Sequence, residues 1–135
     1  GAAKAMELAI NEAQIAPEQV DYINAHGTST HHNDLFETRA IKLAFGEHAK
    51  DMKINSTKSM TGHEMWMAGA SEVIYSTLMM QNNFIAPNLN FEEPDEASAQ
   101  LNIPAQRVNM EFDTFLSNSF GFGGTNSTLI IKKVK

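Results

Sequence analysis

VDYINAHGTST, residues 20–30, joins a short apolar segment to a polar loop that contains a histidine. Val20, Tyr22 and Ile23 lie among polar neighbours in an alternating pattern that is typical of a short β-strand. His26 should therefore lie in the loop that leaves the carboxyl end of this strand. In α/β sheets, ligands bind at that end of the strands. The stretch thus predicts both an α/β fold and the place of a ligand site.

Helix and strand patterns alternate on both sides of this strand. Apolar residues at helical spacing mark the helices, and short apolar runs mark the strands. The expected elements are helices over residues 2–14, 34–45 and 67–80, a strand over residues 54–56, and strands over residues 112–119 and 125–132. A glycine-rich turn joins the last two strands, which should form an antiparallel hairpin. This order of elements predicts a layered α/β domain.

Local signals define the ends of these elements. Asn33 or Asp34 can cap the second helix, with Glu37 three residues after Asp34 as in a capping box. Gly46 is expected to end this helix. The third helix is apolar enough to be buried. Residues 82–104 are rich in asparagine and proline, and they predict a long irregular segment.

Composition limits the class of protein. The 135 residues have room for one domain with a core. The net charge of −6 argues against nucleic-acid binding, and no apolar run reaches the roughly 20 residues that span a membrane. The absence of cysteine excludes disulfides and thiolate metal sites, and it fits a cytoplasmic protein. Because Gly1 leads straight into a helical pattern with no initiating methionine, we expect the chain to be a piece of a larger protein.

Two histidines lie in segments dense in small polar residues, at residues 24–30 and 56–63. Each alone is more often an ordinary loop residue. Together, His26 and His63 could direct two ring N–H groups at one oxygen and stabilise an enolate or an oxyanion. Gly27 and Gly62 would let the backbone come close to a ligand.

Lys58 precedes the second histidine among small polar residues. It is either a solvated surface lysine or a cation that holds a carboxylate and sets the field around the histidines. Glu37 is the candidate carboxylate. The adjacent His31 and His32 point in opposite directions on an extended segment, so they do not predict a zinc site. With no cysteine and no serine in a nucleophile elbow, these residues indicate part of an active site whose attacking group lies elsewhere.

Residues 24–30, 57–63 and 117–126 together resemble the β-ketoacyl-acyl carrier protein synthases of the Cys-His-His type, in the same order and spacing. The resemblance covers essentially the whole chain and corresponds to the C-terminal half of such an enzyme. It implies a thiolase-like layered αβαβα fold, with a mixed sheet that ends in an antiparallel hairpin. Residues 1–135 would then be a partial ketoacyl-synthase domain. The N-terminal half, with the nucleophilic cysteine, would be absent.

The resemblance implies an acyltransferase activity. Such an enzyme joins malonyl-acyl carrier protein to an enzyme-bound acyl group by decarboxylative Claisen condensation in fatty acid elongation. His26 and His63 would contact the malonyl thioester and stabilise the enolate that forms as carbon dioxide leaves. Lys58 and Glu37 would give structural and electrostatic support. We expect the fragment alone to be inactive, because it has no nucleophile.

Other positions are matched to family roles in the same way. The backbone N–H of Phe122 would form half of an oxyanion hole, and its ring would gate the acyl pocket. Thr28 and Thr30 would hydrogen-bond the pantetheine arm, and Phe120 would contact substrate. In some members a monovalent cation lies near the site, surrounded by oxygen ligands that suit a hard ion. The matching residues here are Asn24, Glu72, Ser117 and Asn118.

The resemblance also implies partners. They are the acyl carrier protein, whose phosphopantetheine carries the thioesters, the N-terminal half, and a second copy in a homodimer. No cofactor of the enzyme's own is implied beyond the cation. Trp66 and Met67 depart from the small residues that usually follow the second histidine, which leaves pocket shape and chain-length preference open.

Two other functions compete with this one. A non-catalytic, chain-length-determining subunit of a ketosynthase heterodimer would have no physical need for both histidines and Lys58. A degradative thiolase usually pairs one histidine with a second cysteine near the C-terminal glycine turn, and this chain has no cysteine. We therefore favour the condensing enzyme.

Overall fold

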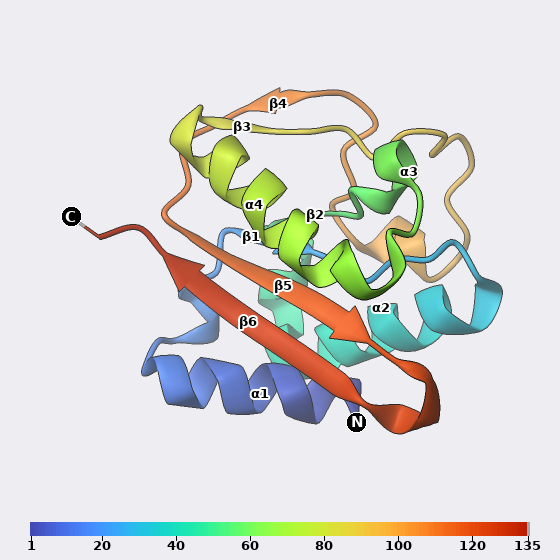
Figure 1. Ribbon diagram of the computed structural model, residues 1–135, viewed down its shortest axis with the longest axis horizontal. Helices are drawn as coiled ribbons and strands as arrows, with labels where there is room; N and C mark the ends of the chain where they lie inside the picture. Colours follow the sequence, from blue (N-terminus) through green and yellow to red (C-terminus); the bar gives the residue numbers. More distant parts are fainter. Residues whose placement is uncertain (135) are drawn as a thin grey trace.

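A four-stranded mixed sheet lies at the centre of the computed structural model, which describes residues 1–134 (Figure 1). Its strand order is β2-β1-β5-β6, with β1 parallel to both β2 and β5, and β6 antiparallel to β5. The strands are β1 (Tyr22–Asn24), β2 (Lys53–Asn55), β5 (Thr114–Phe120) and β6 (Asn126–Lys132). The predicted α/β class, the mixed sheet and the closing hairpin are confirmed.

Helices cover both faces of this sheet. Side chains alternate along a strand, so Ile23 and Leu116 point to one face while Tyr22 and Phe115 point to the other. The first face packs against α1 (Ala2–Ala13) and α2 (His31–Phe45). The second packs against α4 (Ala68–Gln81) and the short strand β3. The result is three layers, with α1 and α4 on opposite sides of the β5–β6 hairpin in Figure 1.

Short elements fill the connections. A one-turn helix, α3, follows β2, and a small separate sheet pairs β3 with β4 in antiparallel fashion. Their bounds are α3 (Lys58–Thr61), β3 (Phe84–Ile85) and β4 (Val108–Asn109), and single 3₁₀ turns span Pro17–Gln19, Gly46–Lys50, Met65–Met67, Ser98–Gln100 and Phe122–Gly124. The segment predicted to be irregular contains only β3 and one such turn. No helix within residues 1–134 is long and apolar enough to cross a membrane.

The predicted cap of α2 is wrong, although its end is confirmed. The helix begins at His31, after an extended Thr30, rather than at Asn33 or Asp34. The first turn closes there because the Asp34 amide donates to the Thr30 carbonyl at 3.0 Å. The Asn33 side chain donates to the Asp34 carboxylate instead of capping the backbone. Helix α2 stops before Gly46, which has a φ of 56°.

The predicted burial of α4 is only half right. Ile74 and Leu78 are 58% and 49% exposed, whereas Glu72 and Ser76 are buried at 2% and 0%. Part of the inward face of this helix is therefore polar. These two residues are buried because Ser76 hydrogen-bonds to Asn24 at the end of β1 and Glu72 hydrogen-bonds to Lys58 of α3.

Candidate active site

The two predicted histidines meet at the carboxyl end of the sheet. His26 follows β1 and His63 lies beyond α3, which follows the neighbouring parallel strand β2. Their ring centroids are 5.7 Å apart, with the rings nearly perpendicular at 85°. The ring of Phe120, at the end of β5, lies 5.5 Å from that of His26. Because β1, β2 and β5 run parallel, their three carboxyl ends bring these side chains together.

Gly27 lets the first loop pass close to the second. Its backbone has a φ of 41°, and a Cβ placed on it would lie 2.5 Å from the Cβ of Ser56. No larger residue fits this crossing without moving one of the loops. The close approach at Gly27 is therefore to a neighbouring loop, whereas the sequence predicted an approach to a ligand.

Glu37 anchors the loop that carries the first histidine. Its carboxylate is buried and accepts hydrogen bonds from the backbone N–H groups of His26 and Gly27, both at 2.9 Å. The Asn118 side chain also donates to it, at 3.2 Å. Burial raises the pKa of the Glu37 carboxyl, and these three hydrogen bonds oppose that rise. A support role for Glu37 is thus consistent with its contacts, although its partner is the backbone of this loop.

The predicted pairing of Lys58 with Glu37 is wrong. Lys58 is buried and forms an ion pair with Glu72 of α4, which is also buried. Glu37 lies on α2, across the sheet from α4, and its carboxylate already accepts hydrogen bonds from the backbone of the loop that contains His26. The sequence did contain a signal for the true partner. Glu72 and Ser76 lie four residues apart in a mostly apolar helix, and that spacing places them on one face.

The electrostatic surroundings keep His26 neutral near pH 7. Burial, then the positive charge of Lys58, then His63 lower its pKa from 6.5 to about 4. The ring of His63 is held differently. Its Nδ1 accepts the backbone N–H of Met65 at 3.0 Å, so in the neutral ring the hydrogen is on Nε2. Two imidazoles near one another, of which one is fixed as an Nε2–H donor, are suited to binding a carbonyl oxygen or an enolate.

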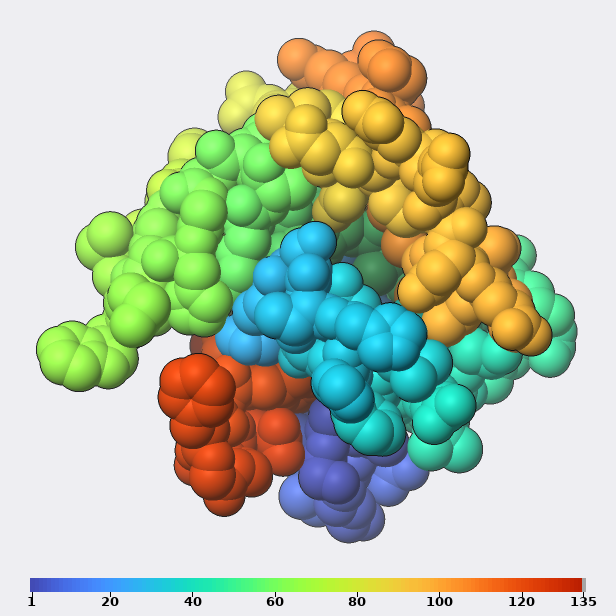
Figure 2. Space-filling model, turned by 90° about the vertical axis from the view of Figure 1, so that its right-hand side faces the viewer, coloured from blue at the N-terminus to red at the C-terminus, as the bar shows by residue number. Residues whose placement is uncertain are grey.

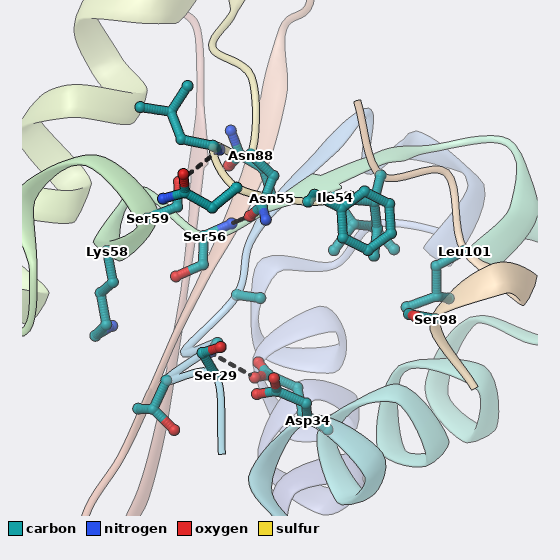
Figure 3. A pocket seen from close by; sticks show the side chains of 18 of the residues that line it. Ser29, Asp34, Ile54, Asn55, Ser56, Lys58, Ser59, Asn88, Ser98 and Leu101 are labelled. Carbon is teal, nitrogen blue, oxygen red and sulfur yellow. Dashed lines mark hydrogen bonds between the residues drawn. The ribbon is translucent and has the colours of Figure 1, made fainter. Parts of the chain in front are cut away.

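A cavity of about 740 Å³ opens onto this site. One wall contains Thr28, Lys58 and His63, and the opposite wall comes from residues 88–103. Figure 2 shows the hollow between these two segments, and Figure 3 shows Lys58 on one side of it with Leu101 on the other. The cavity is large enough for an extended small-molecule group.

The other residues predicted to contact substrate differ in how far they are buried. The hydroxyls of Thr28 and Thr30 are 3.1 Å apart, and Thr28 lines the cavity. Phe122 is fully exposed in the turn between β5 and β6, whereas the ring of Phe120 contacts His26. Sequence reasoning overlooked Asn88, whose side chain accepts the amide of Ser56 at 2.9 Å and ties the two cavity walls together.

The four residues matched to a cation site fit one in part. Asn24 donates to Thr57 at 3.2 Å and to Ser76 at 3.1 Å, which leaves its Oδ1 buried and without a partner among residues 1–134. Oε2 of Glu72 is likewise buried and unpartnered in that part of the chain. Ser117 lies opposite Asn24 in the sheet register.

Asn118 does not offer a free side-chain oxygen. Its amide donates to Glu37, and its Oδ1 accepts the Thr128 hydroxyl at 2.8 Å. No cluster of three or more histidine, aspartate or glutamate side chains suited to a metal occurs within residues 1–134. Two buried free oxygens are a donor set for a weakly held hard cation rather than for zinc.

Comparison with known proteins identifies the family. The chain matches the β-ketoacyl synthase C-terminal domain over residues 1–92. It belongs to this family. The domain is 50% identical over 129 residues to 3-oxoacyl-[acyl-carrier-protein] synthase 2 of Coxiella burnetii, covering 96% of this chain and 31% of that protein. It is 47% identical over 135 residues to 3-oxoacyl-[acyl-carrier-protein] synthase 1 of Escherichia coli K12, covering 100% of this chain and 32% of that protein.

Solved structures show the same thiolase-like ketosynthase fold. A β-ketoacyl synthase from Burkholderia phymatum has a TM-score of 0.91 at 40% identity, over 98% of this domain and 32% of that chain. A ketosynthase in complex with its type II PKS acyl-carrier protein has a TM-score of 0.94 at 38% identity, over 98% of this domain and 33% of that chain. The ishigamide ketosynthase/chain length factor has a TM-score of 0.94 at 33% identity, over 100% of this domain and 33% of that chain. The domain therefore spans about a third of the length of its relatives.

Proposed function

We propose that the chain is the C-terminal portion of a β-ketoacyl-acyl carrier protein synthase that elongates fatty acids. The observation that carries this proposal is the meeting of His26 and His63, 5.7 Å apart, beside the buried Lys58–Glu72 pair. Family membership and the names of the relatives support the same reaction. On this proposal, residues 1–135 are a partial ketoacyl-synthase domain.

The reaction divides into two bond changes. The bond between the carboxyl carbon and the α-carbon of the malonyl thioester breaks, and its electron pair forms an enolate. Ring N–H groups of His26 and His63 would stabilise the enolate oxygen, and the lowered pKa of His26 means that it would do so as a neutral imidazole. The enolate carbon then attacks an acyl thioester, and the thiolate leaves as the new carbon–carbon bond forms.

The nucleophile would come from the rest of the synthase, since these 135 residues contain no cysteine. We expect the isolated chain to be inactive for that reason. When the enolate attacks the acyl thioester, the carbonyl oxygen of that thioester becomes an oxyanion. The backbone N–H of Phe122 would stabilise this oxyanion, and the exposed Phe122 ring is free to cover an acyl pocket. Phe120 would contact substrate beside His26.

An acyl carrier protein would deliver both thioesters. The cavity of about 740 Å³, with Thr28 on its wall and the Thr30 hydroxyl 3.1 Å from that of Thr28, suits a phosphopantetheine arm. A similar ketosynthase structure is a complex with its acyl-carrier protein, which supports this partner. We also propose a homodimer in the cytoplasm, and no cofactor in the chemical step. A monovalent cation at Asn24 and Glu72 would add fixed positive charge beside the Lys58 pair.

A chain-length-determining subunit without catalysis is the second candidate. It is favoured by the similarity to a ketosynthase/chain length factor structure. The intact set of His26, His63 and the Lys58–Glu72 pair supports the catalytic subunit instead, because a scaffold has no need of buried charge, which is costly to maintain.

The test uses the complete synthase, in which this chain is joined to the segment with the nucleophile. His63→Ala should abolish condensation and malonyl decarboxylation while acyl loading of the nucleophile stays largely intact. His32→Ala is the matched control, because His32 is exposed, stacks on Phe36 and is not among the residues that line the cavity. Normal condensation by His63→Ala would refute the role of His63. A parent protein that cannot be loaded with an acyl group would favour the chain-length subunit.

A further inference from the structure

The turn after the second histidine holds an unfavourable backbone conformation. Met65 has a φ of 53°, in the left-handed region that residues with a side chain seldom adopt. The amide of this same residue donates to Nδ1 of His63 at 3.0 Å. The orientation of the His63 ring therefore depends on a turn that must be held from outside, since such conformations persist only where their surroundings fix them.

Glu64, between these two residues, provides the link to a rigid element. Its Oε1 accepts a hydrogen bond from the hydroxyl of Tyr75 at 3.0 Å, and Tyr75 lies in the middle of α4. The nearby Ser71 hydroxyl, and after it the Tyr75 hydroxyl, lower the pKa of the Glu64 carboxyl, so it is an ionised acceptor at neutral pH. The reaction proposed above makes no use of either Glu64 or Tyr75.

Helix α4 also holds the lysine of the site. Glu72 pairs with Lys58, and Tyr75 follows Glu72 by three residues, so both side chains leave the same side of the helix. A single helix thus connects to Lys58 directly and to His63 through Glu64, and both of these residues line the cavity. Their relative position is set by one rigid body rather than by two independent loops.

We propose that Glu64 is a positioning residue for His63, whose hydrogen bond from Tyr75 holds the 63–65 turn and thereby fixes the ring with Nε2–H available to the cavity. The inference rests on the proposed function for the chemical use of His63, while the contacts that carry it do not. It predicts that losing the Tyr75–Glu64 hydrogen bond changes the tautomer of His63 and lowers kcat, and that losing only the negative charge of Glu64 changes neither.

Four variants of the complete synthase separate these effects. Tyr75→Phe removes only the hydroxyl, and Glu64→Ala removes the acceptor. Glu64→Gln keeps an oxygen acceptor but removes the charge, and the double variant Glu64→Ala/Tyr75→Phe removes both ends. Thr77→Val is the matched control, because it deletes a hydroxyl of α4 that only bonds back to the carbonyl of Val73.

We expect Tyr75→Phe and Glu64→Ala each to lower kcat for malonyl decarboxylation about fivefold, the loss that one net hydrogen bond predicts, with KM nearly unchanged. The double variant should be no slower than either single one. Glu64→Gln and Thr77→Val should remain close to the parent. Nitrogen-15 NMR of the histidine rings should show a single Nε2–H tautomer of His63 in the parent and in Glu64→Gln, and a mixture in the other site variants.

Additive losses in the double variant, or Glu64→Gln as slow as Glu64→Ala, would overturn the proposal, because the charge or unrelated packing would then be responsible. An unchanged tautomer in Tyr75→Phe would also overturn it. The NMR result does not depend on activity. If the parent fails to condense malonyl thioesters, the proposed function fails, and the tautomer of His63 still decides whether Glu64 positions it.

Discussion

The rings of His26 and His63 lie nearly perpendicular, with their centroids 5.7 Å apart, although 37 residues separate them in sequence. Neighbouring parallel strands bring them to this distance, since β1 and β2 pair in register from Tyr22 with Lys53 to Asn24 with Asn55. The paired strands thus set where the two histidine-bearing loops leave the sheet. The 63–65 turn then sets the orientation of the second ring.

The pKa of His26 predicts how stability depends on pH. The folded protein takes up this proton only near pH 4, whereas an unfolded chain takes it up near pH 6.5. The contribution of His26 to the free energy of unfolding is therefore fully present above pH 6.5 and is lost as the pH falls through 4. A proton NMR titration of the His26 ring should give a midpoint well below 6.5. In His26→Gln, the thermal midpoint should fall less between pH 6.5 and 4 than in the parent; an equal fall would contradict the assignment.

The Lys58–Glu72 pair should be more costly to break than to replace. Lys58→Met leaves a buried carboxylate whose pKa is already raised, chiefly by burial, so we expect a loss of about 3–5 kcal/mol in the free energy of unfolding. The double variant Lys58→Met/Glu72→Leu should recover most of that loss while remaining inactive. Urea denaturation of both variants checks this. As a control, Lys50→Met breaks the exposed pair with Glu47 and should leave the stability close to that of the parent.

Substitution of Gly27 should act through the crossing of the two loops. Gly27→Ala places a Cβ 2.5 Å from that of Ser56, so we expect a destabilisation of about 1–3 kcal/mol together with displacement of His26. Gly123→Ala is a matched control, because Gly123 also has a positive φ, of 82°, but no atom lies within 4 Å of the added carbon. Thermal unfolding would show equal losses of stability in the two variants if backbone strain alone, and not the contact between the loops, were responsible.

The sequence predicted most of the framework and the meeting of the histidines. Alternation around Tyr22 and Ile23 located β1, and the glycine-rich turn located the final hairpin, because both signals are local. The partner of Lys58 could not be found in this way. It depends on which carboxylate lies on the same side of the sheet as Lys58. From the sequence, Glu37 was the candidate and Glu72 was matched only to a cation site, whereas Glu72 is the partner.

Hydropathy alone also misjudged α4. Its apolar residues suggested a helix buried by the hydrophobic effect, yet Ser76 is more deeply buried than Ile74. Specific hydrogen bonds, such as that between Ser76 and Asn24, offset the cost of burying the polar residues on the inward face. The spacing of Glu72 and Ser76 shows that they share one face of α4, but it does not identify their partners, since Ser76 and Asn24 lie 52 residues apart.

The two walls of the cavity have different origins. The wall that contains His63 follows hydrogen-bonded strands, whereas the wall from residues 88–103 has little regular structure. This second wall is attached at its start through the Ser56–Asn88 and Ser59–Leu89 hydrogen bonds (Figure 3), and near its end through the Ile54 amide, which donates to the Asn102 carbonyl at 3.1 Å. Changes in composition or length between these attachment points can alter the shape of the cavity without altering the separation of the imidazoles. One architecture can thus diversify in what it accommodates while its reactive geometry stays constant.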